Sequence, residues 1–365
     1  MFQKRVLLIA ANGLGKTGVP NVIFQVAKVL SKQSSVDLVV FCDDDYYSES
    51  LRKIGVNIIK INLKKPTNRL LRGLWRLFVE KRITYSFFKN LFKTNKYDVI
   101  HSFKEYDSAY IFKCATKANI KKRIIHCNNE INIPKNFISR FLFNKKKRIL
   151  YKYTTDFVGV SNRCCQVSYP TRKYRVIYNS FDEETYNINM QSNLKDNEFV
   201  LTQVATFSTR KNQLFSLKVI DLIRKNGVNA KLNIFGFEAE AGYLNKINSL
   251  IKELDLSDCV TVHDGRGSVK DILKKTTFFL LPSLSEAAPI VLVEAQACGI
   301  FCFVANNVTQ DIDCGGICFL ELDATTWSKA IIDKFKQNGN KRLAFNTKKF
   351  SFDQFEKNIL GLYGW

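Results

Sequence analysis

The stretch LLPSLSEAAPIVLVEAQACG, residues 280–299, has the composition of a buried strand, a tight turn and a helix in succession. The apolar run ends at Leu281, and Pro282 and Ser283 follow as turn residues. We expect a helix to begin near Pro289, because proline suits the first turn of a helix, where its missing N–H leaves no hydrogen bond unmade. A strand followed at once by a helix is the repeating unit of a parallel α/β sheet.

The same alternation of short apolar runs with helical periodicity extends over the whole chain. Strands are expected in the first half at residues 6–10, 36–42, 58–61, 99–102, 124–126 and 157–160. Further strands are expected in the second half at 200–205, 232–235, 260–262, 278–281 and 301–304. We therefore predict an α/β fold of two doubly wound parallel sheets, which are Rossmann-like and face a cleft. In such sheets ligands bind beyond the carboxyl ends of the strands.

A polar, asparagine-rich segment separates the two series of strands. It has no apolar periodicity, as expected of a linker. The chain of 365 residues also exceeds one ordinary hydrophobic core, since about 150 residues per domain is usual. We predict an N-terminal domain at 1–183, a linker at 184–197, a C-terminal domain at 198–349, and a C-terminal helix at 350–365 that packs back on the first domain.

Two carboxylates and a helix start in the quoted stretch are suited to a phosphorylated ligand. The free N–H groups at the helix start, around residues 288–291, would form an anion site for a diphosphate. Glu286 lies before the helix and Glu294 within it, so both can accept hydrogen bonds from sugar and ribose hydroxyls. The alternatives are a helix cap for Glu286 and a solvated face for Glu294, which the flanking apolar residues disfavour.

Glu286, seven intervening residues, Glu294, Ala295 and Gly299 resemble the signature of the family 4 glycosyltransferases, retaining enzymes of the GT-B fold that use nucleotide-sugars. Further stretches are similar to other motifs of that family: YDVIHS at 97–102, TDFVGVS at 155–161, VIYNSFD at 176–182 and VATFSTRKNQ at 204–213. The resemblance extends from about residue 5 to residue 320.

The resemblance implies a role for each matching residue. Lys211 matches the lysine that binds the donor diphosphate, Glu286 the glutamate that contacts the transferred sugar, and Glu294 the one that holds the ribose. His126 resembles the first-domain histidine that approaches sugar and acceptor across the cleft, although a strand-end histidine with satisfied hydrogen bonds is the alternative. Departure of a nucleoside diphosphate builds negative charge on the β-phosphate, which a fixed cation and a helix amino end stabilise without a metal.

The sequence departs from the family pattern in the donor site. Thr206 stands where the family usually has arginine, which leaves Lys211 with help from Arg210. Alanines at 287–288 replace the usual Gly-Phe, in a loop that shapes the sugar pocket. The expected catalytic residues are Glu286, Lys211 and His126. The expected donor-binding residues are Lys211, Arg210, Thr206, Glu294, Ala288, Pro289, Ile290, Gly13, Gly15 and Gly18. We expect no metal and no cofactor other than the donor substrate.

A rival reading comes from Ala10–Thr17 (AANGLGKT), which satisfies a relaxed Walker A pattern and indicates a P-loop nucleotidase. Against it, alanine replaces the first glycine, and Pro20 sits where the P-loop helix should already be running. In a GT-B enzyme the same glycines bring the backbone close to donor phosphates and acceptor. Asp43–Asp45 mimics the Asp-x-Asp metal site of the other glycosyltransferase fold, but its place after the second strand favours a polar loop.

The net charge of +23 lies entirely in the first half of the chain. Residues 1–180 carry 35 Lys and Arg against 11 Asp and Glu, whereas residues 181–365 carry 21 against 22. This asymmetry indicates an anionic partner, and a solvated basic face is the alternative. Arg69–Lys93 and Asn136–Tyr153 interleave apolar and basic residues, as helices in a membrane interface do, although ordinary surface helices remain an alternative. Nucleic acid is disfavoured because no RNA-binding motif is present.

No apolar run approaches the roughly 18 residues of a membrane span, and the ten cysteines lack zinc spacing and are expected to be reduced thiols. We therefore predict a cytoplasmic protein, peripheral on the inner face of the cytoplasmic membrane. The resemblance implies a hexosyltransferase that moves a sugar from a UDP-linked donor to a membrane-associated glycan or lipid-linked saccharide in surface polysaccharide synthesis. A GT-B binding module without catalytic activity is a further alternative.

Overall fold

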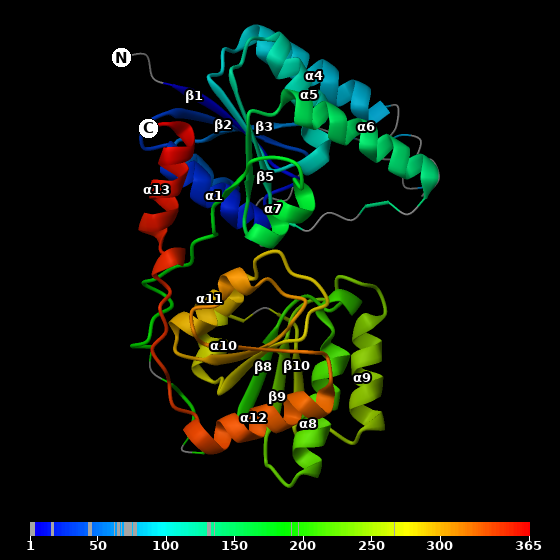
Figure 1. Cartoon of the computed structure of the whole chain (residues 1–365), viewed down its shortest axis with the longest axis vertical. Coiled ribbons are helices and arrows are strands. Elements are labelled where there is room, and N and C mark those ends of the chain that lie inside the picture. Colours follow the sequence, from blue (N-terminus) through cyan, green and yellow to red (C-terminus); the bar gives the residue numbers. More distant parts are fainter. Residues whose placement is uncertain are drawn as a thin grey trace. The chain divides into compact units, whose positions relative to one another are not determined.

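The computed structural model describes residues 4–15, 18–42, 46–61, 63, 66, 68, 75, 79–129, 133–134, 136–190, 192–195, 197–265 and 267–365. The chain divides into two compact units. The first comprises Met1–Asn179 and Phe355–Trp365, and the second comprises Ser180–Gln354. Each unit contains its own sheet with helices around it (Figure 1). The prediction of two doubly wound parallel-sheet α/β units is confirmed.

The sheet of the first unit has the strand order β3-β2-β1-β4-β5-β6-β7, and its strands pair in parallel. Its strands are β1 (Arg5–Ile9), β2 (Ser35–Val40), β3 (Asn57–Lys60), β4 (Val99–Ser102), β5 (Lys122–Cys127), β6 (Asp156–Gly159) and β7 (Arg175–Val176). Its helices are α1 (Gly18–Leu30), α2 (Ser48–Lys53), α4 (Lys81–Thr94), α5 (Ala109–Lys117), α6 (Phe137–Tyr153), α7 (Asn162–Ser168) and most of α13 (Phe352–Tyr363).

Continuous apolar runs explain the central strands of this sheet. The side chains of β1 from Val6 to Ile9 are fully buried, as expected of a parallel strand with helices on both faces. In α1, Val22, Val26 and Val29 recur on one helical face and are buried against the sheet. The strand order reverses between β1 and β4, so the carboxyl ends of these strands border a crevice of the kind that binds ligands in α/β sheets.

The sheet of the second unit has the order β10-β9-β8-β11-β12-β13. Its strands are β8 (Val200–Val204), β9 (Lys231–Phe235), β10 (Val260–His263), β11 (Phe278–Leu281), β12 (Phe301–Ala305) and β13 (Ile317–Leu320). Its helices are α8 (Gln213–Lys225), α9 (Tyr243–Glu253), α10 (Val269–Lys274), α11 (Ile290–Ala297) and α12 (Ala324–Asn338). Single-turn 3-10 helices lie at Glu105–Ser108 (η2), Thr209–Lys211 (η3), Gln310–Ile312 (η4) and Lys348–Phe350 (η5).

The core of the second unit packs α8 and α12 on the sheet. Trp327 in α12 is fully buried and meets Phe215 of α8 edge to face, with 5.2 Å between ring centroids. Its indole N–H donates to the Glu321 carbonyl at 2.8 Å, so burial leaves that donor satisfied. Because β8 and β11 are neighbours in this sheet, the loops after them lie side by side.

The strand predictions agree with the structure to within two residues, and those at 99–102 and 278–281 coincide with it. Two strands, β7 and β13, were not predicted, because β7 has only two residues and β13 follows a glycine pair. The segment predicted as a linker, 184–197, belongs to the second unit. The C-terminal helix α13 packs on the first unit, where the Tyr363 hydroxyl lies 2.9 Å from Nδ1 of His101.

Two sequence expectations concern the whole chain. Within the described ranges no helix is long and apolar enough to cross a membrane. All ten cysteines are free thiols, and most of them are buried in the two cores.

Candidate active site

The turn after β8 fixes the backbone of Lys211. The side-chain amide of Gln203 donates to the Lys211 carbonyl at 2.8 Å, and Ser216 Oγ in turn donates to Gln203 Oε1 at 2.8 Å. Asn212 follows with a left-handed φ of 56°, which asparagine tolerates better than most residues. Its side-chain amide donates to the Pro282 carbonyl at 3.1 Å, which ties this turn to the loop after β11.

Lys211 and Glu286 form an ion pair at the meeting point of these two loops. Both side chains are largely buried, with 14% and 8% of their surfaces exposed. Ser283 Oγ donates to the paired carboxylate oxygen at 2.9 Å, and the Arg210 guanidinium lies 3.6 Å from the other oxygen. Arg210 also donates to the Ser285 carbonyl at 3.2 Å. The structure thus brings together three predicted residues, two cations and one carboxylate.

Burial acts on the charge state of this cluster. Loss of water lowers the pKa of Lys211, while the Glu286 carboxylate opposes that shift because it favours the charged ammonium. An anionic ligand that replaced Glu286 as the partner of Lys211 would stabilise the cation in the same way. The cluster is therefore chemically suited to exchange an internal carboxylate for a phosphate, with Arg210 as a second cation.

The helix α11 begins at Ile290, four residues beyond Glu286. Pro289 is its N-cap residue, and it offers no side-chain acceptor to the first N–H groups of the helix. These groups, at the amino end of the helix dipole, are therefore left for a ligand. Ala288, Pro289 and Ile290 are each half-buried, so this end of the helix is partly accessible. A backbone bridge between Glu286 and Val308 holds the loop in place.

Glu294 lies one turn further along α11, where it is half-buried. Burial, and then the negative charge of Asp182, raises the pKa of Glu294 to about 7. The carboxyl therefore changes between its protonated and ionised forms near neutral pH, and it can either donate to or accept from a hydroxyl group. Glu294 in turn contributes to the raised pKa of Tyr186, for which burial is the main cause.

The predicted sugar histidine, His126, lies in β5 of the first unit and is completely buried. Its Nδ1 is 3.1 Å from Nε2 of His101, whose Nδ1 is 2.9 Å from the Tyr363 hydroxyl. Burial lowers the pKa of His126 to about 3, so the ring is neutral. Its Nε2 has no hydrogen-bond partner in the part of the chain that the structure describes. Because His126 is completely buried, a ligand can contact it only after neighbouring side chains move.

The glycine-rich turn is described in part. Gly13 and Gly15 lie between β1 and α1, and Gly18 is the first residue of α1, where an added Cβ would meet no atom within 4 Å. Pro20 lies in the first turn of α1, where proline is compatible with a helix, so its position is no objection to a P-loop and that inference was wrong. Lys16 and Thr17 lie outside the described residues, as does Asp43–Asp45.

Sequence reasoning missed the residues that hold the site in shape. Ser283 and Gln203 are polar, fully buried and bonded to the two charged partners or their backbone. Gln296 is also buried in α11, and its Oε1 accepts from the backbone N–H groups of Cys314 and Gly316 at 2.8 and 3.3 Å. A polar residue inside an otherwise apolar run is the one signal that could have found them.

The Thr206 side chain supplies no charge to replace the arginine usual in the family. Its carbonyl accepts from the Gln213 amide at 2.9 Å, which fixes the backbone of the loop. Arg210, four residues further on, is the residue that reaches Glu286.

Comparisons with known proteins find similar sequences and similar folds. Residues 185–312 match the family model described as glycosyl transferases group 1. The capsular polysaccharide biosynthesis glycosyltransferase CapH of Staphylococcus aureus is 27% identical over 279 residues, which cover 73% of this chain and 76% of CapH. The UDP-Gal:alpha-D-GlcNAc-diphosphoundecaprenol alpha-1,3-galactosyltransferase of Escherichia coli is 23% identical over 317 residues, which cover 80% of this chain and 76% of that enzyme.

Among solved structures, HepE of Anabaena in complex with UDP and glucose superposes with a TM-score of 0.76 at 13% identity, covering 98% of this chain and 99% of that chain. The predicted GT-B fold and the predicted family are confirmed, and the P-loop nucleotidase and the non-catalytic scaffold are set aside. The chain is therefore a GT-B glycosyltransferase of polysaccharide or glycan biosynthesis, and its second unit is similar to the group 1 glycosyltransferases.

Proposed function

We propose that this enzyme transfers a sugar from a UDP-linked donor, with retention of anomeric configuration, to a membrane-associated glycan or lipid-linked saccharide. One observation carries the proposal: Lys211 and Arg210 meet Glu286 in the loop that leads into the amino end of α11. That cluster offers two cations and backbone N–H groups to a diphosphate, and a carboxylate to the hydroxyls of the attached sugar. The UDP bound by HepE and the UDP-Gal in the name of the Escherichia coli relative support a uridine nucleotide.

In the proposed reaction the bond between the anomeric carbon and the β-phosphate oxygen breaks while the acceptor oxygen bonds to that carbon. Negative charge grows on the departing diphosphate, where Lys211 and the α11 amino end stabilise it. The acceptor hydroxyl loses a proton, which passes to the leaving phosphate oxygen on the same face of the sugar. Glu286 holds the transferred sugar, and Glu294 holds the ribose of the donor. His126 contacts sugar or acceptor once it becomes accessible.

The proposed reaction needs no metal ion, because the two cations supply the positive charge that a metal would bring. We test this part by adding EDTA to the transfer assay, with added magnesium as the comparison. A rate unchanged by the chelator is expected. A rate that falls with EDTA and returns with magnesium would contradict metal independence and leave the donor site itself in place.

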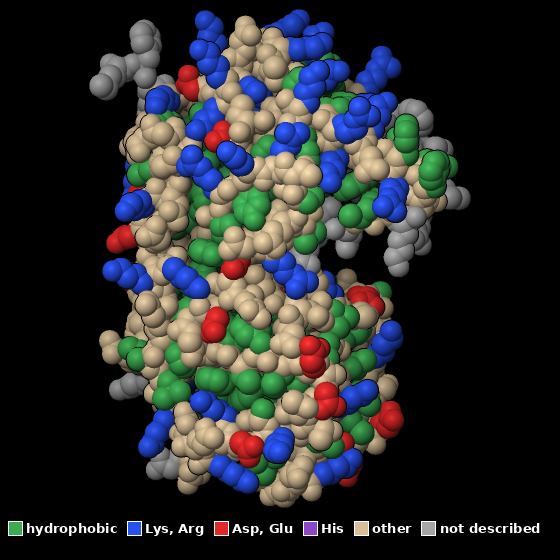
Figure 2. Space-filling model, viewed as in Figure 1, with side chains coloured by type: hydrophobic (Ala, Val, Ile, Leu, Met, Phe, Trp, Pro, Cys, Tyr) green, Lys and Arg blue, Asp and Glu red, His purple; other side chains and the backbone are tan. Residues whose placement is uncertain are grey.

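The proposed place of action is the inner face of the cytoplasmic membrane. The positive charge of the first half supports it, and Figure 2 shows Lys and Arg in excess on the visible face of the first unit. The lipid diphosphate acceptor in the name of the Escherichia coli relative also supports it. Two segments are predicted to dock. Of Arg69–Lys93 the structure describes residue 75 and the residues from Val79 onward, and it describes Asn136–Tyr153 throughout.

The donor site is tested with Lys211→Met and Glu286→Gln, which keep side-chain volume and remove the charges. Thermal shift with a panel of nucleotide-sugars identifies the donor, because a ligand at 100-fold over its Kd adds about 2.7 kcal/mol to stability. We expect wild type and Lys218→Met, an exposed control on α8, to respond alike. Loss of both ligand response and transfer in the two site variants is expected, and wild-type turnover in both would overturn the proposal. NMR of the product linkage tests retention.

A further inference from the structure

The amino-terminal half of α6 exposes large apolar side chains. Phe137, Ile138 and Phe141 expose 84%, 68% and 62% of their surfaces, and Ile133 just before the helix exposes 55%. Four of the most exposed large apolar residues of the described chain thus lie within nine positions. Asn136 caps this end by accepting from the Ser139 N–H at 3.1 Å, so the apolar residues belong to a defined helix start.

The other half of α6 anchors the helix to the first unit. Leu150 and Tyr151 are buried, and the Tyr151 hydroxyl donates to the Ser168 carbonyl at 2.8 Å. Phe143 packs on Tyr106 with 4.7 Å between ring centroids. Beyond these contacts every side chain from residue 136 to 141 is exposed, and Figure 1 shows this end of α6 extending away from the sheet. Ordinary core packing therefore accounts for one half of the helix and leaves the apolar end unexplained.

Positive charge continues along the same helix. Phe137–Tyr153 holds six Lys and Arg residues and no Asp or Glu. Lys146 pairs with Asp107 at 2.5 Å, whereas Arg140, Lys145 and Arg148 have no acidic partner among the described residues. A helix on which most cations lack a counter-charge favours an anionic partner.

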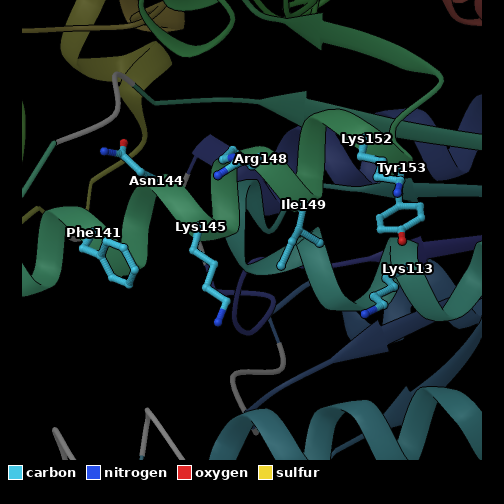
Figure 3. A pocket seen from close by; sticks show the side chains of 8 residues that line it. All are labelled: Lys113, Phe141, Asn144, Lys145, Arg148, Ile149, Lys152 and Tyr153. Carbon is cyan, nitrogen blue, oxygen red and sulfur yellow. The ribbon is translucent and has the colours of Figure 1, made fainter.

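The cations line two open grooves, one on each side of α6. The larger, of about 650 Å³, includes Lys145, Arg148 and Lys152 together with Lys113, which Figure 3 shows on the neighbouring helix. The other, of about 590 Å³, shares Arg148 and Lys152 and adds Lys147 and Arg172. Among the residues that the structure describes, neither groove is lined by an acidic side chain. Each therefore offers several cations to one phosphate group.

The order of residues along one face distinguishes a bilayer from other anionic partners. Phe137, Phe141, Lys145, Arg148 and Lys152 recur at helical spacing, apolar first and basic afterwards. Phe137 and Arg148 are eleven residues apart, or about 16 Å along a helix. In a lipid leaflet the apolar side chains would lie among the acyl chains, and the cations would lie at the level of the phosphates. Interfacial helices insert about 5–10 Å into this boundary. RNA or an acidic protein would satisfy the cations and leave the exposed phenylalanines in water.

We propose that α6 is an obliquely inserted membrane anchor, in which Ile133, Phe137, Ile138 and Phe141 enter an anionic bilayer and the two basic grooves bind lipid phosphates. The proposal rests on the proposed function only in that the acceptor lies at a membrane. It assigns docking to α6. Insertion of the apolar side chains is independent of lipid charge, whereas binding of phosphates by the basic grooves depends on it.

The test is co-sedimentation of the full chain with vesicles of phosphatidylcholine alone or mixed with phosphatidylglycerol. The charge variant Lys145→Glu/Arg148→Glu/Lys152→Glu should lower binding to the mixed vesicles at least about 100-fold, since each basic residue near anionic lipid contributes several-fold. The apolar variant Phe137→Ser/Phe141→Ser should lower it about tenfold or more. The matched controls are Lys246→Glu/Lys252→Glu on α9 and Phe237→Ser, which make the same changes at exposed sites of the second unit and should bind as wild type does.

A second measurement reports insertion directly. Tryptophan fluorescence of Phe137→Trp should move to shorter wavelength with mixed vesicles, and brominated acyl chains should quench it. Circular dichroism checks that each variant remains folded. Wild-type binding in both α6 variants, or a tryptophan that brominated lipid does not quench, would overturn the proposal. So would concentration-dependent dimerisation lost in Phe137→Ser/Phe141→Ser, or RNA binding at physiological salt through the grooves. Donor binding by thermal shift is independent of these results, so failure of the transfer proposal is seen separately.

Discussion

The charged residues of the two units are arranged in opposite ways. At the donor site of the second unit, Lys211 and Arg210 converge on one carboxylate, Glu286, which offsets one of the two positive charges. Along α6 of the first unit, cations lie in a row and only Lys146 has an acidic partner within the described chain. Paired, buried charge is suited to a small ligand that exchanges partners, whereas unpaired, exposed charge is suited to an extended anionic surface.

The largest expected effect follows from loss of the buried ion pair between Lys211 and Glu286. Lys211→Ala should lower transfer about 100-fold or more, because it removes a fixed cation from the departing phosphate. It also leaves Glu286 with Arg210 alone, and breaking a buried pair costs about 3 kcal/mol of stability. Lys211→Ala/Glu286→Ala should recover much of that stability and no activity. Chemical denaturation of Lys211→Ala, Glu286→Ala and the double variant measures this, and losses of stability that simply add would show that the pair is not coupled.

The raised pKa of Glu294 makes the stability of the second unit depend on pH. Its pKa of about 7 in the folded chain exceeds the ordinary 4.5, so the folded state holds this proton over a range where the unfolded state has lost it. Protonated Glu294 therefore stabilises the folded state fully below about pH 4.5. This contribution to the free energy of unfolding falls by up to about 3 kcal/mol as pH rises to about 7. Glu294→Gln should unfold with a flatter pH profile in that window. Identical profiles for variant and wild type would refute the raised pKa.

A smaller effect concerns the buried histidine pair. Tyr363→Phe removes the hydroxyl that lies 2.9 Å from His101 and leaves a buried ring nitrogen without that partner, at a cost of about 1–2 kcal/mol. Tyr106→Phe is the control, because it also removes one buried hydroxyl, which donates to the Ser168 carbonyl at 2.8 Å and bonds to no histidine in the described part of the chain. Thermal unfolding compares the two. Histidine ¹⁵N shifts should change for Tyr363→Phe alone, and unchanged shifts would contradict the link from α13 to His126.

The smallest expected effect is at Ser283. Its hydroxyl donates to Glu286 at 2.9 Å from a fully buried position, so Ser283→Ala should leave the carboxylate less firmly held. A lost hydrogen bond to a charged group corresponds to about 1.5 kcal/mol, or roughly tenfold in the apparent KM for the donor. Steady-state kinetics at fixed acceptor concentration measures it. An unchanged donor KM would show that Lys211 and the bridge to Val308 suffice to place Glu286.

The sequence was most informative where the signal is local. Apolar runs and turn residues follow from neighbouring positions, so the strands at 99–102 and 278–281 were predicted to the residue. The helix start near Pro289 followed from one proline, and the structure has Pro289 as the N-cap. Identification of Lys211 and Glu286 depended on motif resemblance. Their polar supports Ser283 and Gln203 were missed because a polar residue in an apolar run does not show which group it will contact.

The sequence by itself determined the alternation of strands and helices, the division of charge between the halves and the candidate residues of the donor site, because each of these depends on composition or short-range spacing. Only the tertiary structure decided that Lys211 meets Glu286, 75 positions away, since that contact requires β8 and β11 to be neighbours in one sheet. It also decided that His126 is buried while Phe137 is exposed. Burial depends on what the rest of the chain packs against a residue, and hydrophobicity alone does not specify it.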